Sequence, residues 1–383
     1  MTMESHVHQR YAQGAREVVP ALCCPVSYDS ALLALLPREI IDRDYGCGDP
    51  SRYVQPGDTV LDLGSGAGKI CYIAAQLVGE SGRVIGIDMN DEMLALARKY
   101  QPEMAHKLGS DRVSFRKGRI QDLALDLESL GHWLVAHPVT DLASLTLLEQ
   151  HQHRMRHQDP MIPDASVDLV ISNCVLNLVD DTLKSQLVRE IVRVLKPGGR
   201  VAISDIVADA PIPQTLKQNP ELWTGCISGA FTETDFVRAF REAGLTGVTI
   251  DKWETTPWQV MEGIEFRSVT LTAVKHSITQ QTEGGHAILY RGPFACVEDD
   301  LGNRFPVGVR MAVSREAHAR MGCAPFVDHV VRFAPLRPQL PTPYLAPPGA
   351  ERPASAGRGG QVQSVGQGER KPCGPAGGGG KCC

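Results

Sequence analysis

The sequence predicts an α/β protein built around one doubly wound, mostly parallel sheet. An apolar run at 60–63 stops at a glycine-rich loop, and apolar residues then follow at helical spacing over 70–77. A second apolar run, 84–87, ends at Asp88. Strand and helix patterns keep alternating to about residue 275, as expected of a sheet with helices on both faces.

The glycine-rich loop, Gly64-Ser65-Gly66-Ala67-Gly68, predicts the start of a nucleotide-binding βαβ unit. Glycine permits positive φ and close approach of a ligand to the backbone, and Asp88 lies where a carboxylate takes both hydroxyls of a ribose. The dinucleotide fingerprint has a last glycine where this chain has Lys69. Asp62, just before the loop, suits the amino group or sulfonium of S-adenosylmethionine. We therefore expect this cofactor rather than NAD.

Composition sets the broad class. The 383 residues can bury a sizeable core, and no apolar run approaches the length of a membrane span. The first ten residues are polar and lack the apolar core of a signal peptide. The formal charge of −5 gives no electrostatic reason to bind nucleic acid. We expect a cytoplasmic protein with neither a membrane nor a nucleic acid as partner.

The lead-in to about residue 53 is predicted to be largely helical, with apolar faces at 31–36 and 40–41. The turn 45–50 ends it, because two glycines and a proline exclude regular structure there. This turn carries Cys47, which we expect to be exposed to chemistry.

A helix over 92–100, a strand at 113–115 and a loop at 118–123 follow Asp88, and the loop is expected to close over the adenine. Residues 124–162 then predict an inserted helical hairpin. Its histidines alternate with arginine and glutamine, so we expect solvated helix surface rather than metal ligands; they are His132, His137, His151, His153 and His157.

The strand predicted at 167–172 delivers Asn173 and Cys174 at its carboxyl end, where open α/β sheets bind ligands. The remaining elements are a helix over 183–195 stopped by 196–199, a strand at 200–206, an irregular loop over 211–224 leading to Cys226, a helix over 232–243, and strands at 248–250 and 268–273.

We expect three parts in the chain. Residues 1–275 form the cofactor-binding domain, and short β-like runs suggest a small β-rich appendage over 276–335. Residues 336–383 are rich in proline, glycine and serine and end in cysteines, so we expect a disordered tail.

Eleven cysteines without an export signal argue against structural disulfides and favour reactive or ligating thiols. No C-x-x-C pair occurs, which disfavours a zinc ribbon. Cys71, in the helix after the glycine loop, is expected to be a buried filler. Three cysteines lie instead on separate loops: Cys47, Cys174 and Cys226.

Three thiolates that leave an open face suit a soft, pyramidal centre with a lone pair better than tetrahedral zinc. Trivalent arsenic is such a centre. Its lone pair could take the sulfonium methyl group of S-adenosylmethionine, with positioning supplying much of the rate.

At this point the chain resembles the arsenite S-adenosylmethionine methyltransferases over roughly residues 8–275. The most specific segments are Asp44-Tyr45-Gly46-Cys47-Gly48 and Ser172-Asn173-Cys174-Val175-Leu176-Asn177-Leu178. The glycine loop, Lys196-Pro197-Gly198-Gly199 and Gly225-Cys226 agree with them. The resemblance implies a Rossmann-like class I methyltransferase fold, methylation of arsenite or methylarsenite in arsenic detoxification, and a thiol reductant, thioredoxin or glutathione.

The resemblance also implies roles for individual residues. Cys47, Cys174 and Cys226 would hold As(III), and Cys23 or Cys24 would match the family's N-terminal redox cysteine. The implied cofactor-binding residues are Tyr11, Asp62, Gly64, Ser65, Gly66, Asp88, Met89, Ile120, Gln121 and Asn173. Two alternatives stay open: a methyltransferase of a small, quinone-like organic acceptor, and a non-catalytic metalloid-binding sensor.

Overall fold

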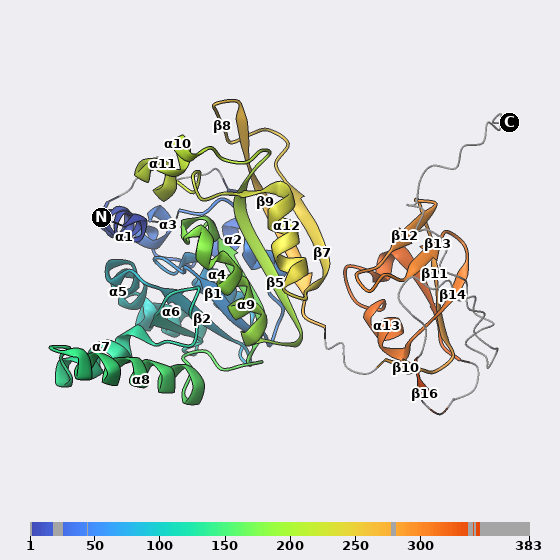
Figure 1. Ribbon diagram of the computed structural model, residues 1–383, viewed down its shortest axis with the longest axis horizontal. Coiled ribbons are helices and arrows are strands. Elements are labelled where there is room, and N and C mark those ends of the chain that lie inside the picture. The colour runs from blue at the N-terminus through green and yellow to red at the C-terminus, as the bar shows by residue number, and fades with distance from the viewer. Residues whose placement is uncertain are drawn as a thin grey trace. The chain divides into compact units, whose positions relative to one another are not determined.

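The computed structural model describes residues 2–17, 26–43, 45–276, 281–335, 340 and 342–344. The chain divides into two compact units, Met1–His276 and Ser277–Cys383, which Figure 1 shows with their elements labelled. Among the described residues, none of the helices combines the length and apolar character needed to cross a bilayer.

The first unit is built on a sheet with the strand order β3-β2-β1-β4-β5-β9-β7. The strands from β3 to β5 are parallel, and β9 is antiparallel to both β5 and β7. Two short strands, β6 (Phe231–Thr232) and β8 (Gln259–Met261), pair with β5 and β9. The main strands are β1 Thr59–Leu63, β2 Arg83–Asp88, β3 Val113–Lys117, β4 Val167–Asn173, β5 Leu195–Ala208, β7 Thr246–Trp253 and β9 Ile264–Val274. The predicted doubly wound sheet is confirmed.

Helices cover both faces of this sheet (Figure 1). The core on one face contains residues of α4 (Lys69–Leu77), α5 (Asp91–Lys99) and α6 (Gln101–Leu108). The core on the other face contains residues of α9 (Lys184–Val194) and α12 (Glu233–Glu242). The carboxyl ends of the parallel strands therefore meet at one edge between two packed layers, where a ligand site is expected.

The described part of the lead-in is helical, as predicted: α1 Met3–Arg16, α2 Ser30–Leu33, α3 Arg38–Asp42 and the 3₁₀ turn η2 Pro50–Tyr53. Arg10 joins α1 to a distant segment, because its guanidinium donates to the carbonyl of Glu221 at 2.8 Å and to the hydroxyl of Thr224 at 2.6 Å.

The predicted helical hairpin within 124–162 is confirmed. It consists of α7 (Leu127–Ala136) and α8 (Leu142–Gln158), which lie side by side in Figure 1. Asp141 and Ser144 form a capping box that starts α8. The helix contains no buried residue, so its histidines are not part of a core.

The expectation of an irregular loop over 211–224 was wrong. The segment 211–224 contains the short helices α10 (Gln214–Lys217) and α11 (Pro220–Thr224). Asn219 caps α11 by accepting the N–H groups of Glu221 and Leu222, and Pro220 opens it. The predicted helix stop at 196–199 is confirmed, because α9 ends at Val194. These residues also belong to β5, in which Gly198 and Gly199 exchange backbone hydrogen bonds with Lys275.

The described residues of the second unit form short β-strands, an α-helix and a 3₁₀ turn: β10 Thr282–Glu283, β11 His286–Tyr290, β12 Cys296–Glu298, β13 Arg304–Pro306, β14 Arg310–Val313, α13 Arg315–Arg320, η5 Val327–His329, β15 Val330–Phe333 and β16 Thr342–Pro343. It has its own apolar core around Ile288 and Tyr290 and a buried ion pair of 2.6 Å between Arg320 and Asp299. Most of the tail expected over 336–383 lies outside the described residues.

Candidate active site

A cavity of about 410 Å³ opens beside the carboxyl ends of β1, β2 and β4. The size is typical of a small-molecule site. All ten residues predicted to bind the cofactor line it: Tyr11, Asp62, Gly64, Ser65, Gly66, Asp88, Met89, Ile120, Gln121 and Asn173.

The glycine loop forms the floor of this cavity. Gly64 and Ser65 donate their N–H groups to the carbonyl of Ile87, at 2.8 and 2.9 Å. Gly64 has φ of 71°, and a Cβ there would lie 2.5 Å from Val175, so only glycine fits. Gly66 also has positive φ, but a Cβ there would meet nothing within 4 Å, because the space above it is open.

The floor fits an adenosine cofactor. The hydroxyl of Ser65 is buried and has no hydrogen-bond partner in the described part of the chain, which makes it available to a ligand. The Asp88 carboxylate accepts the N–H groups of Gly66 and Asn90, both at 2.8 Å. Burial raises the pKa of Asp88, while these N–H groups oppose the shift. They fix the orientation of the carboxylate.

Asp62 is only 2% exposed and accepts a hydrogen bond of 3.2 Å from the thiol of Cys71. Cys71 is fully buried, which confirms its expected role as a filler. Burial, and then the neighbouring Asp62, raise the pKa of the Cys71 thiol well above its usual value, so Cys71 stays protonated and unreactive.

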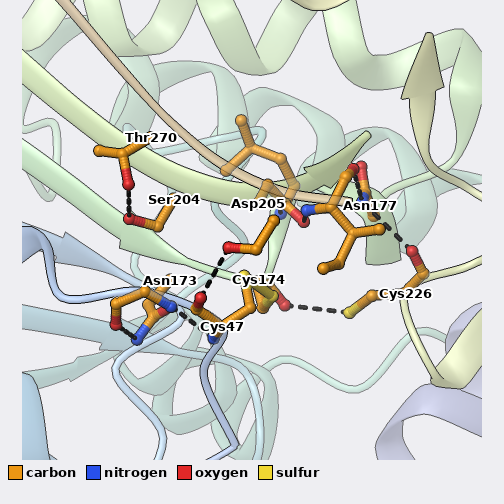
Figure 2. The surroundings of a disulfide bond; sticks show 12 residues. Cys47, Asn173, Cys174, Asn177, Ser204, Asp205, Cys226 and Thr270 are labelled. Carbon is orange, nitrogen blue, oxygen red and sulfur yellow. Dashed lines mark hydrogen bonds between the residues drawn. A yellow bond between two sulfur atoms is a disulfide. The ribbon is translucent and has the colours of Figure 1, made fainter. Parts of the chain in front are cut away.

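Cys47 and Cys174 form a disulfide, with their Cα atoms 5.8 Å apart (Figure 2). The sequence argued against disulfides, and for this pair that expectation was wrong. A cysteine count does not show which residues meet in space, whereas the fold brings together two cysteines that are 127 positions apart. Cys47 is also 2% exposed rather than open to solvent, and its carbonyl accepts from Ser268 at 2.7 Å.

Asn173 holds this pair in place. Its side-chain oxygen accepts the N–H groups of Cys47 and Gly48, at 2.9 and 3.0 Å, and its amide donates to the Gly48 carbonyl at 2.8 Å (Figure 2). A Cβ at Gly46 would lie 2.0 Å from that amide nitrogen. The residue before Cys174 therefore binds the turn that carries Cys47.

The third predicted cysteine lies beside this pair. The Cys226 thiol donates to the carbonyl of Cys174 at 3.2 Å (Figure 2). Cys174 and Cys226 have φ of 60° and 63°, a conformation that is uncommon outside glycine. Burial, followed by the charge and hydrogen bond of Cys226, raises the pKa of Tyr11 well above its usual value, so its hydroxyl stays protonated. Cys174 lines the cavity, whereas Cys23 and Cys24 lie outside the described residues.

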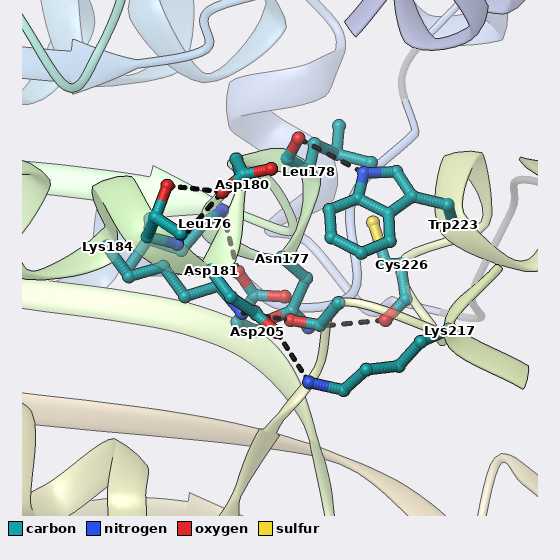
Figure 3. A network of polar contacts seen from close by, with 12 residues as sticks. Leu176, Asn177, Leu178, Asp180, Asp181, Lys184, Asp205, Lys217, Trp223 and Cys226 are labelled. Atoms are coloured by element: carbon teal, nitrogen blue, oxygen red, sulfur yellow. Dashed lines mark hydrogen bonds and ion pairs between the residues drawn. The ribbon is translucent and has the colours of Figure 1, made fainter. Parts of the chain in front are cut away.

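A buried polar network that the sequence did not reveal supports the two loops (Figure 3). Asp205 accepts the N–H groups of Leu176 and Ile206, at 2.9 and 2.8 Å. Burial raises the pKa of Asp205 to about 7, although these hydrogen bonds oppose it. Asn177 donates to the carbonyls of Ile206 at 2.7 Å and Cys226 at 3.2 Å. An aspartate within the apolar strand 201–207 was the available signal.

Lys184 lies at the edge of this network (Figure 3). Its ammonium group pairs with Asp181 at 2.6 Å, and burial lowers its pKa. Asp181 also pairs with Lys217. Lys184 and Asp205 are both buried, and the charge of Lys184 opposes the rise that burial causes in the pKa of Asp205. In the described ranges, no group of three histidine, cysteine or acidic side chains could hold a metal ion.

Comparison with known proteins agrees with this architecture. Residues 55–137 and 140–244 match a methyltransferase domain family. Residues 278–362 match a domain of unknown function, DUF8838. The sheet order, the glycine loop and the aspartate that ends β2 thus define a class I methyltransferase that uses S-adenosylmethionine.

Individual similar proteins narrow this class to one family. An arsenite methyltransferase of Mus musculus is 31% identical over 83% of this chain and 77% of its own length. One from Aquipseudomonas alcaligenes is 37% identical over 61% of this chain, but the alignment spans only 58% of that relative. The crystal structure of an arsenic(III) S-adenosylmethionine methyltransferase from Chlamydomonas reinhardtii superposes with a TM-score of 0.54 at 27% identity, covering 84% of this chain and 99% of that one. The chain belongs to the arsenite methyltransferase family.

Proposed function

We propose that this protein methylates trivalent arsenic with S-adenosylmethionine, and that Cys47, Cys174 and Cys226 hold the arsenic. The observation that carries the proposal is the meeting of these three cysteines at the edge of the cofactor cavity. Cys47 and Cys174 are close enough to be bonded, and the Cys226 thiol reaches the Cys174 carbonyl. Once the disulfide is opened, three thiols on these adjoining loops can share one small, soft ion.

The Cys47–Cys174 disulfide would have to be reduced before both cysteines could bind arsenic. Two reducing thiols would open the Cys47–Cys174 bond and leave as a new disulfide, and each cysteine would then carry a proton. Arsenous acid can then exchange its three hydroxyl groups for the sulfurs of the three thiols, whose protons leave with the hydroxyl groups as three waters. We propose thioredoxin or glutathione as the reductant, with Cys23 or Cys24 as a relay, and the cytoplasm as the compartment, since thiols stay reduced there.

The surroundings favour such an exchange. Cys47, Cys174 and Cys226 belong to one apolar cluster with Ile206 and Ile227. Apolar neighbours exclude the water that would hydrolyse an arsenic–sulfur bond. Tyr11, kept protonated by its raised pKa, can donate to the sulfur of Cys226 and hold that sulfur in place as the ligand is bound.

The residues that would hold the cofactor are the glycine loop, with the free hydroxyl of Ser65, and the carboxylate of Asp88. Asp62 would face its cationic end, and the loop with Ile120 and Gln121 would cover the adenine. When bound, S-adenosylmethionine supplies an electrophilic methyl group that the arsenic lone pair can take up. Detoxification then follows from conversion of arsenite into methylated products.

Methyl transfer from labelled S-adenosylmethionine tests the proposal. The purified full chain, with a thiol reductant, should label arsenite and methylarsenite. Transfer only to quinone-like organic acceptors would mean that the cysteines merely pack. Tight arsenite binding without turnover would identify a metalloid sensor. Omission of the reductant should suppress turnover from the start, because the Cys47–Cys174 disulfide would stay closed.

A further inference from the structure

The side chains of helix α8 do not belong to the apolar core. None of its 17 residues is buried. His153 and His157 are both exposed and lie four positions apart, which places them on one face of the helix. Their ring centroids are 4.2 Å apart, with an angle of 77° between the planes. The two imidazoles are therefore neighbours on an open surface.

The other histidine rings of the hairpin with ring contacts stack on a tryptophan, whereas His153 and His157 contact each other. His137 and His151 stack on Trp133, with centroid distances of 4.3 and 4.2 Å. This stack ties α7 to α8. Within the described part of the chain, neither His153 nor His157 takes part in a hydrogen bond or ion pair, so their nitrogens are available to a ligand.

A hollow of about 350 Å³ adjoins the pair; it is lined by Leu147, Gln150, His153, Arg154, His157 and Gln158. Arg154 is the positive group in this hollow, and its guanidinium lies 3.3 Å from the Nδ1 of His151. Arg156 is occupied by an ion pair of 2.9 Å with Asp122. Glu149 precedes His153 by one helical turn on the same face and adds a negative charge to it.

Two histidines at this helical spacing can chelate one cation, as in the H-E-x-x-H arrangement of zinc enzymes. Imidazole nitrogen favours borderline ions such as Cu²⁺, Ni²⁺ and Zn²⁺. It does not favour the soft As(III), so this site is independent of arsenic methylation. In the described ranges no third histidine, cysteine or acid completes a cage, so water must fill the other positions.

We propose that His153 and His157 form a two-imidazole surface site for a borderline divalent cation. Each imidazole replaces one water molecule on the ion, and no oxidation or reduction takes place. The bound ion cross-links the last two turns of α8, a helix with no fully buried residue. The ion exchanges with solvent, because the site has an open side.

Cu²⁺ is the probe that tests this proposal. The full chain is first treated with N-ethylmaleimide, because free thiols bind and reduce Cu²⁺. Titration calorimetry should then show a site that binds one Cu²⁺ per chain, and electron paramagnetic resonance should show coupling to two nitrogens. His153→Gln and His157→Gln should each weaken binding at least about tenfold, since each removes one of two chelating ligands.

His132→Gln is the matched control, because His132 is an exposed histidine on the partner helix α7. It should leave the Cu²⁺ affinity unchanged. All these positions are exposed, so circular dichroism should show intact helices in every variant. Wild-type affinity in the double variant His153→Gln/His157→Gln, or coupling to fewer than two nitrogens in the parent chain, would overturn the proposal.

Discussion

The side-chain oxygen of Asn173 accepts the backbone N–H of Cys47 at 2.9 Å. Because Asn173 directly precedes Cys174, one amide group sets the separation of two of the cysteines that we assign to arsenic. Asn173 also lines the cofactor cavity. It therefore connects the two halves of the proposed reaction, the methyl donor and the arsenic.

Replacing Asn173 by Ala should release the Cys47 turn. The buried N–H groups of Cys47 and Gly48 would lose their acceptor, at a cost of about 1–3 kcal/mol in the free energy of unfolding for each group. Asn173→Asp keeps an acceptor for these N–H groups but removes the amide N–H that donates to the Gly48 carbonyl, so it should also be destabilised. Urea denaturation measures both variants, and equal stability of Asn173→Ala and the parent would contradict the assigned role.

Replacing Gly46 by Ala tests the contact between Asn173 and the Cys47 turn by changing the turn instead of Asn173. The new Cβ would be placed 2.0 Å from the Asn173 amide, so the turn must move and the Cys47–Cys174 disulfide should form more slowly. Thiol titration after mild oxidation measures this. Gly131→Ala is the control, because a Cβ there meets nothing within 4 Å. It lies in α7 and should stabilise that helix by about 0.5–1 kcal/mol.

Replacing Asp88 by Ala should weaken binding of S-adenosylmethionine. Each charge-assisted hydrogen bond lost to the ribose is expected to cost about 1.5–3 kcal/mol. Titration calorimetry gives the affinity. Asp91→Ala removes a nearby carboxylate from the exposed first turn of α5 and should have little effect. An unchanged affinity in Asp88→Ala would refute the ribose assignment.

The raised pKa of Asp205 gives a dependence of stability on pH. The pKa is about 7 in the folded chain and about 3.9 in the unfolded chain. Between these values the unfolded state has released the proton and the folded state has not. The free energy of unfolding should therefore fall as the pH rises from about 4 to about 7, by up to roughly 1.4 kcal/mol per pH unit.

Asp205→Asn cannot ionise and should lack this slope. Its amide presents only one acceptor to the N–H groups of Leu176 and Ile206, so the variant should be less stable at pH 5 and closer to the parent at pH 8. Urea denaturation at four pH values compares them. Parallel curves for the two proteins over this range would show that Asp205 does not titrate as assigned.

Replacing Cys47 by Ser should separate the two methylations. Arsenite needs three thiolates, whereas methylarsenite needs one fewer because a methyl group fills one position. The variant should lose methylation of arsenite and retain that of methylarsenite. Product analysis by chromatography decides this. Loss of both activities to the same degree would mean that Cys47 serves both steps.

The sequence predicted the sheet and the cofactor cavity well, since both depend on local patterns. Both are built from short segments at a fixed spacing: the apolar strands, the glycine loop and the aspartate that ends β2. The helices at 214–217 and 220–224 were missed, because four- and five-residue helices carry almost no periodicity.

The polar network around the cysteine loops depends on contacts between residues far apart in the sequence, so local patterns could not predict it. Burial of Asp205 and the pairing of Cys47 with Cys174 come from segments that meet only in the folded chain. The motif containing Asn173 and Asn177 was visible in the sequence, but its purpose was not. Each of these amides binds the backbone of a second cysteine loop.

The central claim is that Cys174 holds arsenic while the methyl group is transferred. Transfer of labelled methyl to arsenite by Cys174→Ser, with a reductant present and folding checked by circular dichroism, tests it most directly. Cys323→Ser is the control, because Cys323 is an exposed cysteine of the second unit. We predict no methylation of arsenite or methylarsenite by Cys174→Ser, and parent activity in the control. Full activity of a folded Cys174→Ser protein would contradict the account.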